Sequence, residues 1–148
     1  MSQTNISSPP TSKRNITPIV GLAWHKLGAI AYVLWGLWHI PVVIRLWTQG
    51  TRLVEPAGVG LRLQQGAFHI LFFVLCAIII GMWLNWRNSR LGYWLSLFTI
   101  SWTELGLFIL FMIPGLFPWL PTVWIGPTLW LLAVVCTTLG QRYQPVTP

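Results

Sequence analysis

Three ionisable side chains stand inside long apolar runs of this sequence: His39, His69 and Glu104. A carboxyl group and two imidazoles can divide proton donation and acceptance between them, or bind a metal ion. Two imidazoles on facing helices can also ligate a haem from its two sides. Each of the three belongs to a different apolar run, so they can act together only if those runs are neighbours in the fold.

The composition is that of an integral membrane protein. Hydrophobic residues make up 55% of the 148 positions and charged residues only 7%, whereas a soluble domain carries about 25% charged residues. Many of the eleven tryptophans stand at the ends of apolar runs, where Trp rings sit between lipid chains and headgroups. We therefore expect the lipid bilayer as the main partner. The basic residues behind the net charge of +7 are scattered singly, which predicts no nucleic-acid binding.

Four apolar runs are each close to the length of about 20 residues that a helix needs to cross a bilayer. They must be helical because the bilayer offers no water to unpaired backbone groups. The sequence thus predicts an all-α fold, an integral membrane four-helix up-down transmembrane bundle in residues 20–142. Residues 1–19 are predicted to form a disordered polar tail, residues 46–62 a long loop, and residues 143–148 a short C-terminal tail. The predicted transmembrane segments are 24–45, 63–84, 91–112 and 123–140.

The distribution of Lys and Arg predicts the orientation, because cytoplasmic loops are enriched in them. The bias favours a multi-pass protein with both termini in the cytoplasm, and the short chain with tight loops favours a bacterial inner membrane. The predicted cytoplasmic side carries Lys13, Arg14, Lys26, Arg87, Arg90 and Arg142, against Arg45, Arg52 and Arg62 on the other side.

The three ionisable residues are predicted to share one layer of the membrane. At about 1.5 Å per helical residue, His39 and His69 lie about 9 Å and Glu104 about 12 Å from the same membrane face. Polar groups at this depth should face the bundle interior, since a charge facing lipid costs at least about 2.5–3.5 kcal/mol. We therefore expect one buried polar cluster of His39, His69 and Glu104. The residues expected to support it are Tyr32, Gln65, Ser101 and Thr128.

Helical spacing on the first segment supports this convergence. Residues at three- and four-residue intervals form one stripe, and small residues on it allow another helix to approach closely. The stripe consists of His25, Gly28, Tyr32, Trp35, Gly36 and His39.

Several functions are compatible with such a cluster. In the first, Glu104 is a protonated, hydrogen-bonded packing residue, the histidines join helices, and the chain is a structural or accessory membrane subunit. In the second, the cluster binds haem b or a metal ion. In the third, an enzyme or transporter acts on a hydrophobic small molecule through His39, His69 and Glu104.

The sequence leaves the chemistry itself open. It contains no Walker loop, GxGxxG, HExxH or nucleophile-elbow motif, so catalytic residues and metal ligands stay unknown and enzyme activity stays uncertain. Association as a homo-oligomer or within a larger membrane complex is equally open.

Overall fold

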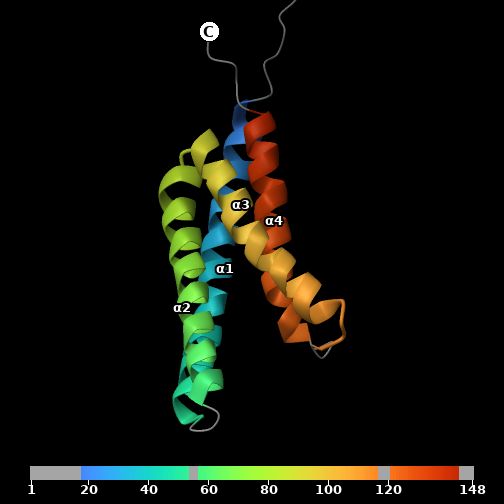
Figure 1. The fold of residues 1–148 in the computed structure, drawn as a ribbon. Helices are drawn as coiled ribbons and strands as arrows, with labels where there is room; N and C mark the ends of the chain where they lie inside the picture. The colour runs from blue at the N-terminus through green and yellow to red at the C-terminus, as the bar shows by residue number, and fades with distance from the viewer. Residues whose placement is uncertain (1–17, 54–56, 117–120, 144–148) are drawn as a thin grey trace, which may run out of the picture.

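The computed structural model describes residues 18–53, 57–116 and 121–143, and these residues fold as an all-α bundle, as the sequence predicts (Figure 1). Four long helices carry the fold, and short π- or 3₁₀-helical turns flank three of them. In chain order the elements are α1 (Pro18–Arg52), α2 (Ala57–Ile80), the π-helix η1 (Gly81–Asn85), α3 (Arg90–Leu107), the π-helix η2 (Phe108–Met112), the 3₁₀-helix η3 (Pro121–Trp124) and α4 (Ile125–Arg142).

Four stretches of these helices are long and apolar enough to cross a membrane, so the chain is a multi-pass integral membrane protein. The stretches are Trp24–Arg52, Gly58–Asn85, Arg90–Met112 and Pro121–Arg142.

The predicted loop over residues 46–62 is wrong, because α1 continues to Arg52 and α2 starts at Ala57. Two glycines explain the short connection. A Cβ on Gly50 would lie 2.6 Å from the carbonyl oxygen of Gly60, so only bare backbones can meet this closely. At the other end, α1 already begins at Pro18, inside the predicted tail, since a first helical turn accepts proline readily.

Helix α1 is the central element and packs along both α2 and α4, while α3 packs against α2 and α4. Glycines on α1 make these contacts close. A Cβ on Gly28 would lie 2.8 Å from the backbone nitrogen of Thr137 on α4, and one on Gly36 would lie 3.1 Å from the carbonyl oxygen of Val74 on α2. Small residues at such crossings are the usual basis of helix association in lipid.

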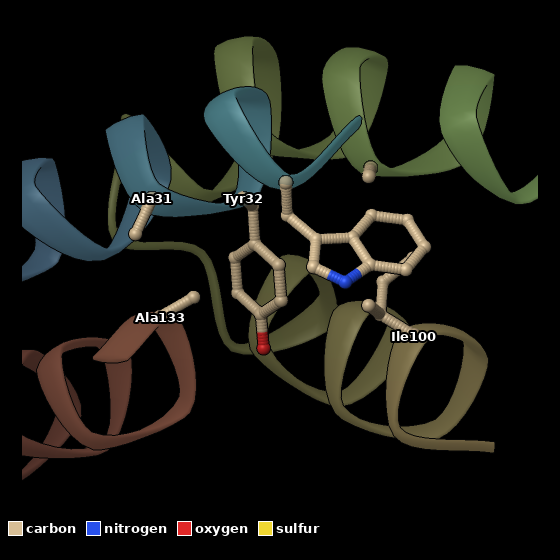
Figure 2. Packing of buried hydrophobic residues seen from close by; sticks show 6 residues of the cluster. Ala31, Tyr32, Ile100 and Ala133 are labelled. Atoms are coloured by element: carbon tan, nitrogen blue, oxygen red, sulfur yellow. The ribbon is translucent and has the colours of Figure 1, made fainter. Parts of the chain in front are cut away.

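The buried core lies where all four helices meet (Figure 2). The ring of Tyr32 reaches from α1 between Ala133 of α4 and Ile100 of α3. Most other large apolar side chains are exposed, as expected for helices that face lipid. The core members are Ala31, Tyr32, Trp35, Ala77, Ile100 and Ala133.

The two ends of the bundle differ. At the end that carries the turn between α2 and α3, Asn88 donates from Nδ2 to the carbonyl oxygen of Gly140 (3.0 Å), and Gln141 donates back to the backbone and side-chain oxygens of Asn88 (3.1 and 3.0 Å). At the opposite end, the α1–α2 pair and the α3–α4 pair diverge (Figure 1). We call the first the tight end and the second the open end.

Substitution of Gly28 by Ala is expected to destabilise the bundle by about 1–3 kcal/mol, the usual cost of overpacking. The added Cβ would lie 2.5 Å from the Thr137 methyl carbon and 2.8 Å from the Thr137 nitrogen, and must push α1 away from α4. Unfolding of the purified protein in mixed detergent micelles measures this change.

Gly66→Ala is the matched control, because a Cβ there meets no atom within 4 Å. It should be neutral or stabilise α2 by up to about 1 kcal/mol, the difference in helix propensity. Equal losses at the two positions would contradict close packing at Gly28.

Candidate functional site

Glu104 lies at the centre of the candidate site. It projects from α3 with 1% of its surface exposed, and its Oε1 accepts a hydrogen bond of 2.6 Å from the indole Nε1 of Trp35 on α1. Hydrogen bonds to a carboxyl group gain strength in a medium of low dielectric constant. This bond joins α1 to α3, two helices that otherwise make little contact.

His39 stands one helical turn beyond Trp35 on α1. Its Nδ1 lies 2.8 Å from the backbone oxygen of Trp35, and the two rings have centroids 4.1 Å apart. A peptide oxygen can only accept, so we assign the ring proton to Nδ1. The Nε2 of the neutral ring is then an acceptor.

Gly126 on α4 brings His39 and Glu104 to the same place. A Cβ on this glycine would lie 3.3 Å from Nε2 of His39 and 3.5 Å from Oε1 of Glu104. Both polar atoms therefore lie against the bare backbone of α4. The site is thus built by three helices: α1 supplies His39, α3 supplies Glu104, and α4 supplies the glycine that makes room for them.

The structure does not bring His69 into this group. His69 is exposed on α2, whereas Ala67, Val74 and Ala77 form the face of α2 that is buried in the bundle. His69 follows Ala67 by two residues, which is about 200° around a helix. The expected cluster of three side chains is therefore corrected to a pair, His39 and Glu104.

The four supporting residues are distributed around the bundle. Tyr32 is buried on the same face of α1 as Trp35. Ser101 is half-buried and accepts a hydrogen bond of 2.9 Å from the indole of Trp130, which links α3 to α4. Gln65 and Thr128 are exposed, and Gln65 accepts from Arg62 Nη1 at 3.2 Å. Of the four, only Tyr32 lies along the line of His39 and Trp35.

Two residues of the site, Trp35 and Gly126, were not predicted as its members. Trp35 stands on the stripe of α1 that ends at His39, and its side chain carries an indole N–H. A buried Trp N–H needs a partner, which was a usable signal. Gly126 carries no side chain, and nothing in its sequence context distinguishes it from the glycines that touch no other helix.

The positions of the possible ligand side chains do not favour the expected haem or metal ion. Among residues 18–53, 57–116 and 121–143, no three His, Cys, Asp or Glu side chains lie close enough to share a metal ion. His39 lies against α4 while His69 is exposed on α2, so these two histidines do not form the pair of imidazoles expected to ligate a haem from its two sides.

Comparisons with known protein families, with curated proteins and with solved structures found no match for this chain. The fold and the site together define a multi-pass membrane protein of four helices, with a buried carboxyl group held by an indole where three helices meet.

A double-mutant cycle on Trp35→Phe and Glu104→Leu should reveal a coupling free energy of about 1–3 kcal/mol, because each single change leaves a buried partner without its hydrogen bond. Unfolding of the purified protein in detergent measures each variant. Glu104→Gln should lose less stability than Glu104→Leu, since the amide oxygen still accepts from the indole.

His69→Leu serves as the control for this cycle, because His69 is exposed and outside the group. Its effect on stability should add to that of Trp35→Phe without coupling. Additive effects of Trp35→Phe and Glu104→Leu would contradict the hydrogen bond between them.

Proposed function

We propose that this chain is an accessory subunit of a larger membrane assembly, and that a partner helix packs on the outward face of α2. The observation that carries the proposal is the exposed imidazole of His69, within a membrane-spanning stretch. Arg62 and Gln65 precede it at helical spacing and are exposed as well. We call these three residues the polar row.

The depth of His69 supports a protein partner. It stands sixteen residues before Asn85, the end of that spanning stretch, which corresponds to about 24 Å along the helix. The hydrocarbon core is about 30 Å thick, so the imidazole lies inside it on the side of the open end. Ionisable side chains at such depth almost always face protein or a water-filled cavity, because exposure to lipid is costly.

The chemistry of the polar row favours a different protein over a second copy. Two copies related by an axis along the membrane normal would place Arg62 beside Arg62, and like charges repel. The Glu104 carboxyl is buried and cannot serve as the counter-charge, and the chain's other carboxylate, Glu55, is outnumbered by Arg45, Arg52 and Arg62 near the same membrane face. We therefore expect a partner that presents carbonyl or carboxylate oxygens near its membrane boundary.

The membrane and the orientation belong to the same proposal. We propose a bacterial inner membrane, because the chain is short and its turns are tight, with both termini in the cytoplasm. The exposed Arg87 and Arg90 at the tight end agree with the cytoplasmic enrichment of Arg.

The alternative of an enzyme or transporter that uses His39, His69 and Glu104 on a hydrophobic small molecule has less support. Its three residues do not converge, since His69 lies on the outward face of α2. The same separation weakens the haem and metal alternatives, which need ligands within a few ångströms of each other.

A photoreactive benzoyl-phenylalanine at Phe72 should form one discrete adduct with another integral membrane protein when cells are irradiated. Phe72 is 57% exposed and stands on the same side of α2 as His69, one turn further along. The adduct should be lost when His69→Leu is added, because the partner then loses its polar contact. Gel mobility and mass spectrometry of the adduct measure the outcome.

The matched control is the same photoreactive residue at Phe98, which is 69% exposed and lies on a different helix, α3, from the polar row. It should give only lipid adducts. An adduct of twice the chain's own mass at Phe72 would show a second copy in place of a different protein, and lipid adducts alone would remove the support for any partner there.

Cysteine labelling tests the orientation. In the Cys76→Ser, Cys136→Ser background, Thr51→Cys at the open end should react with a membrane-impermeant maleimide on intact cells, while Tyr143→Cys should react only after lysis. Both positions are exposed, so accessibility differs only through the side of the membrane. The reverse pattern would place the termini outside.

A further inference from the structure

A line of polar side chains runs through the bundle along one face of α1, and we call it the polar seam. Four members come from α1, at intervals of three, four and seven residues, and the others face them from α3 and α4. The members are His25, Tyr32, Trp35, His39, Glu104 and Thr137.

Two atoms on this seam lack hydrogen bonds. Within the part of the chain that the structure describes, the buried side-chain atoms without a partner are Oη of Tyr32 and Oε2 of Glu104, and each residue is 1% exposed. Thr137 of α4 lies against Gly28, one helical turn before Tyr32 on the same face of α1. Buried polar groups are almost always satisfied, so two exceptions on one seam require an explanation such as bound water.

We propose that the polar seam is a proton path through the membrane, with Glu104 as the group that each proton must occupy. The path depends on the α1–α3–α4 contacts only and does not rest on the accessory-subunit role. From His25 to His39 the seam covers fourteen residues of α1, or about 21 Å, which is most of a hydrocarbon core about 30 Å thick.

The hydrogen bonds at Glu104 decide which atom carries the proton. Oε1 is occupied by the indole N–H of Trp35, so the exchangeable proton of a neutral carboxyl group resides on Oε2. The acceptor on the same side of α4 is Nε2 of His39, since Nδ1 points to a peptide oxygen. Nε2 and the other carboxyl oxygen, Oε1, both lie against Gly126, and because Oε2 has no direct partner a water molecule must carry the proton between Oε2 and Nε2.

Tyr32 continues the path toward the tight end. It stands seven residues from each of the two histidines, about 10 Å along the helix in either direction. The Thr137 hydroxyl donates to the carbonyl oxygen of Ala133 at 2.7 Å, so its oxygen is left to accept. Beyond it, His25 is buried against α4, where a Cβ on Gly140 would lie 2.9 Å from the backbone nitrogen of His25.

One proton moves by a series of balanced exchanges. A proton from the open end binds Nε2 of His39 and is passed through water to the carboxylate form of Glu104. The Oε2–H bond then breaks and water carries the proton to the Tyr32 oxygen, where a new O–H bond forms as the original O–H bond of Tyr32 breaks. The released proton passes to water on the side of Thr137 and His25. Each step breaks one bond to hydrogen and forms one, and Glu104 ends as the carboxylate with which the cycle began.

The test uses the purified full-length protein in liposomes with a trapped pH-sensitive dye and a potassium diffusion potential set by valinomycin. Wild-type protein should raise proton influx at least tenfold over protein-free vesicles. Glu104→Gln should return the influx to the protein-free level while preserving the fold, because its amide oxygen still accepts from Trp35. Tyr32→Phe should lower the influx several-fold.

Thr128→Val is the matched control, since it removes a polar side chain that is exposed on α4 and outside the seam, and its influx should equal that of the wild type. Wild-type influx no greater than that of protein-free vesicles would overturn the proposal. So would a Glu104→Gln variant that conducts as well as the wild type.

Infrared spectroscopy gives a second readout that does not depend on flux. The chain has only two acidic side chains, Glu55 and Glu104, so in Glu55→Gln protein the carbonyl band of a protonated side-chain carboxyl group belongs to Glu104. Transfer to heavy water should shift this band within minutes if the seam admits protons, and Tyr32→Phe should slow the shift. A band that stays unshifted over hours in folded protein would overturn the path.

Discussion

The close approach of α1 to both α2 and α4 is the constraint on which the rest of the structure depends. Lipid chains are as apolar as leucine, so helices in a bilayer associate through close packing and interhelical hydrogen bonds. Gly28 and Gly36 let α1 meet one neighbour on each side at backbone contact. This position leaves the third side of α1 facing inward, and from that side Trp35 reaches Glu104 across the bundle.

Much of the fold follows from composition. The site depends on the direction in which each side chain points around its helix axis, which a sequence shows only indirectly. The rise per helical residue predicts that His39, His69 and Glu104 share one depth in the membrane. Depth does not determine whether a side chain points into the bundle or toward lipid. On α2 that direction is set by Ala67, Val74 and Ala77, which fit against α1 because they are small. The helix thus buries its small residues and turns His69 outward. The short connection near Gly50 and Gly60 was missed for a similar reason, since glycines that suggest a loop in sequence serve here as a helix contact.

The choice of Glu at position 104 is not explained by packing. The oxygen that accepts from Trp35 is needed to satisfy a buried indole, and a glutamine would supply that oxygen without an ionisable group. Burial of a carboxyl group costs free energy unless both oxygens are satisfied, yet Oε2 has no partner among the residues that the structure describes. A group that costs stability and offers nothing to packing that its amide would lack is typical of a functional residue.

The two ends of the bundle differ in the hydrogen bonds that join their helices. At the tight end, Asn85 donates to Ser96 at 2.8 Å, and Asn88 and Gln141 bind each other and α4. Toward the open end, Glu104 keeps an unpaired oxygen inside the bundle and His69 faces outward from it. Hydrogen bonds between helices thus fix the tight end, while the two helix pairs diverge at the open end (Figure 1). Because regions that bind or move are drawn from the less stable parts of a structure, the partner surface proposed around His69 lies on the side where this chain holds its helices least firmly.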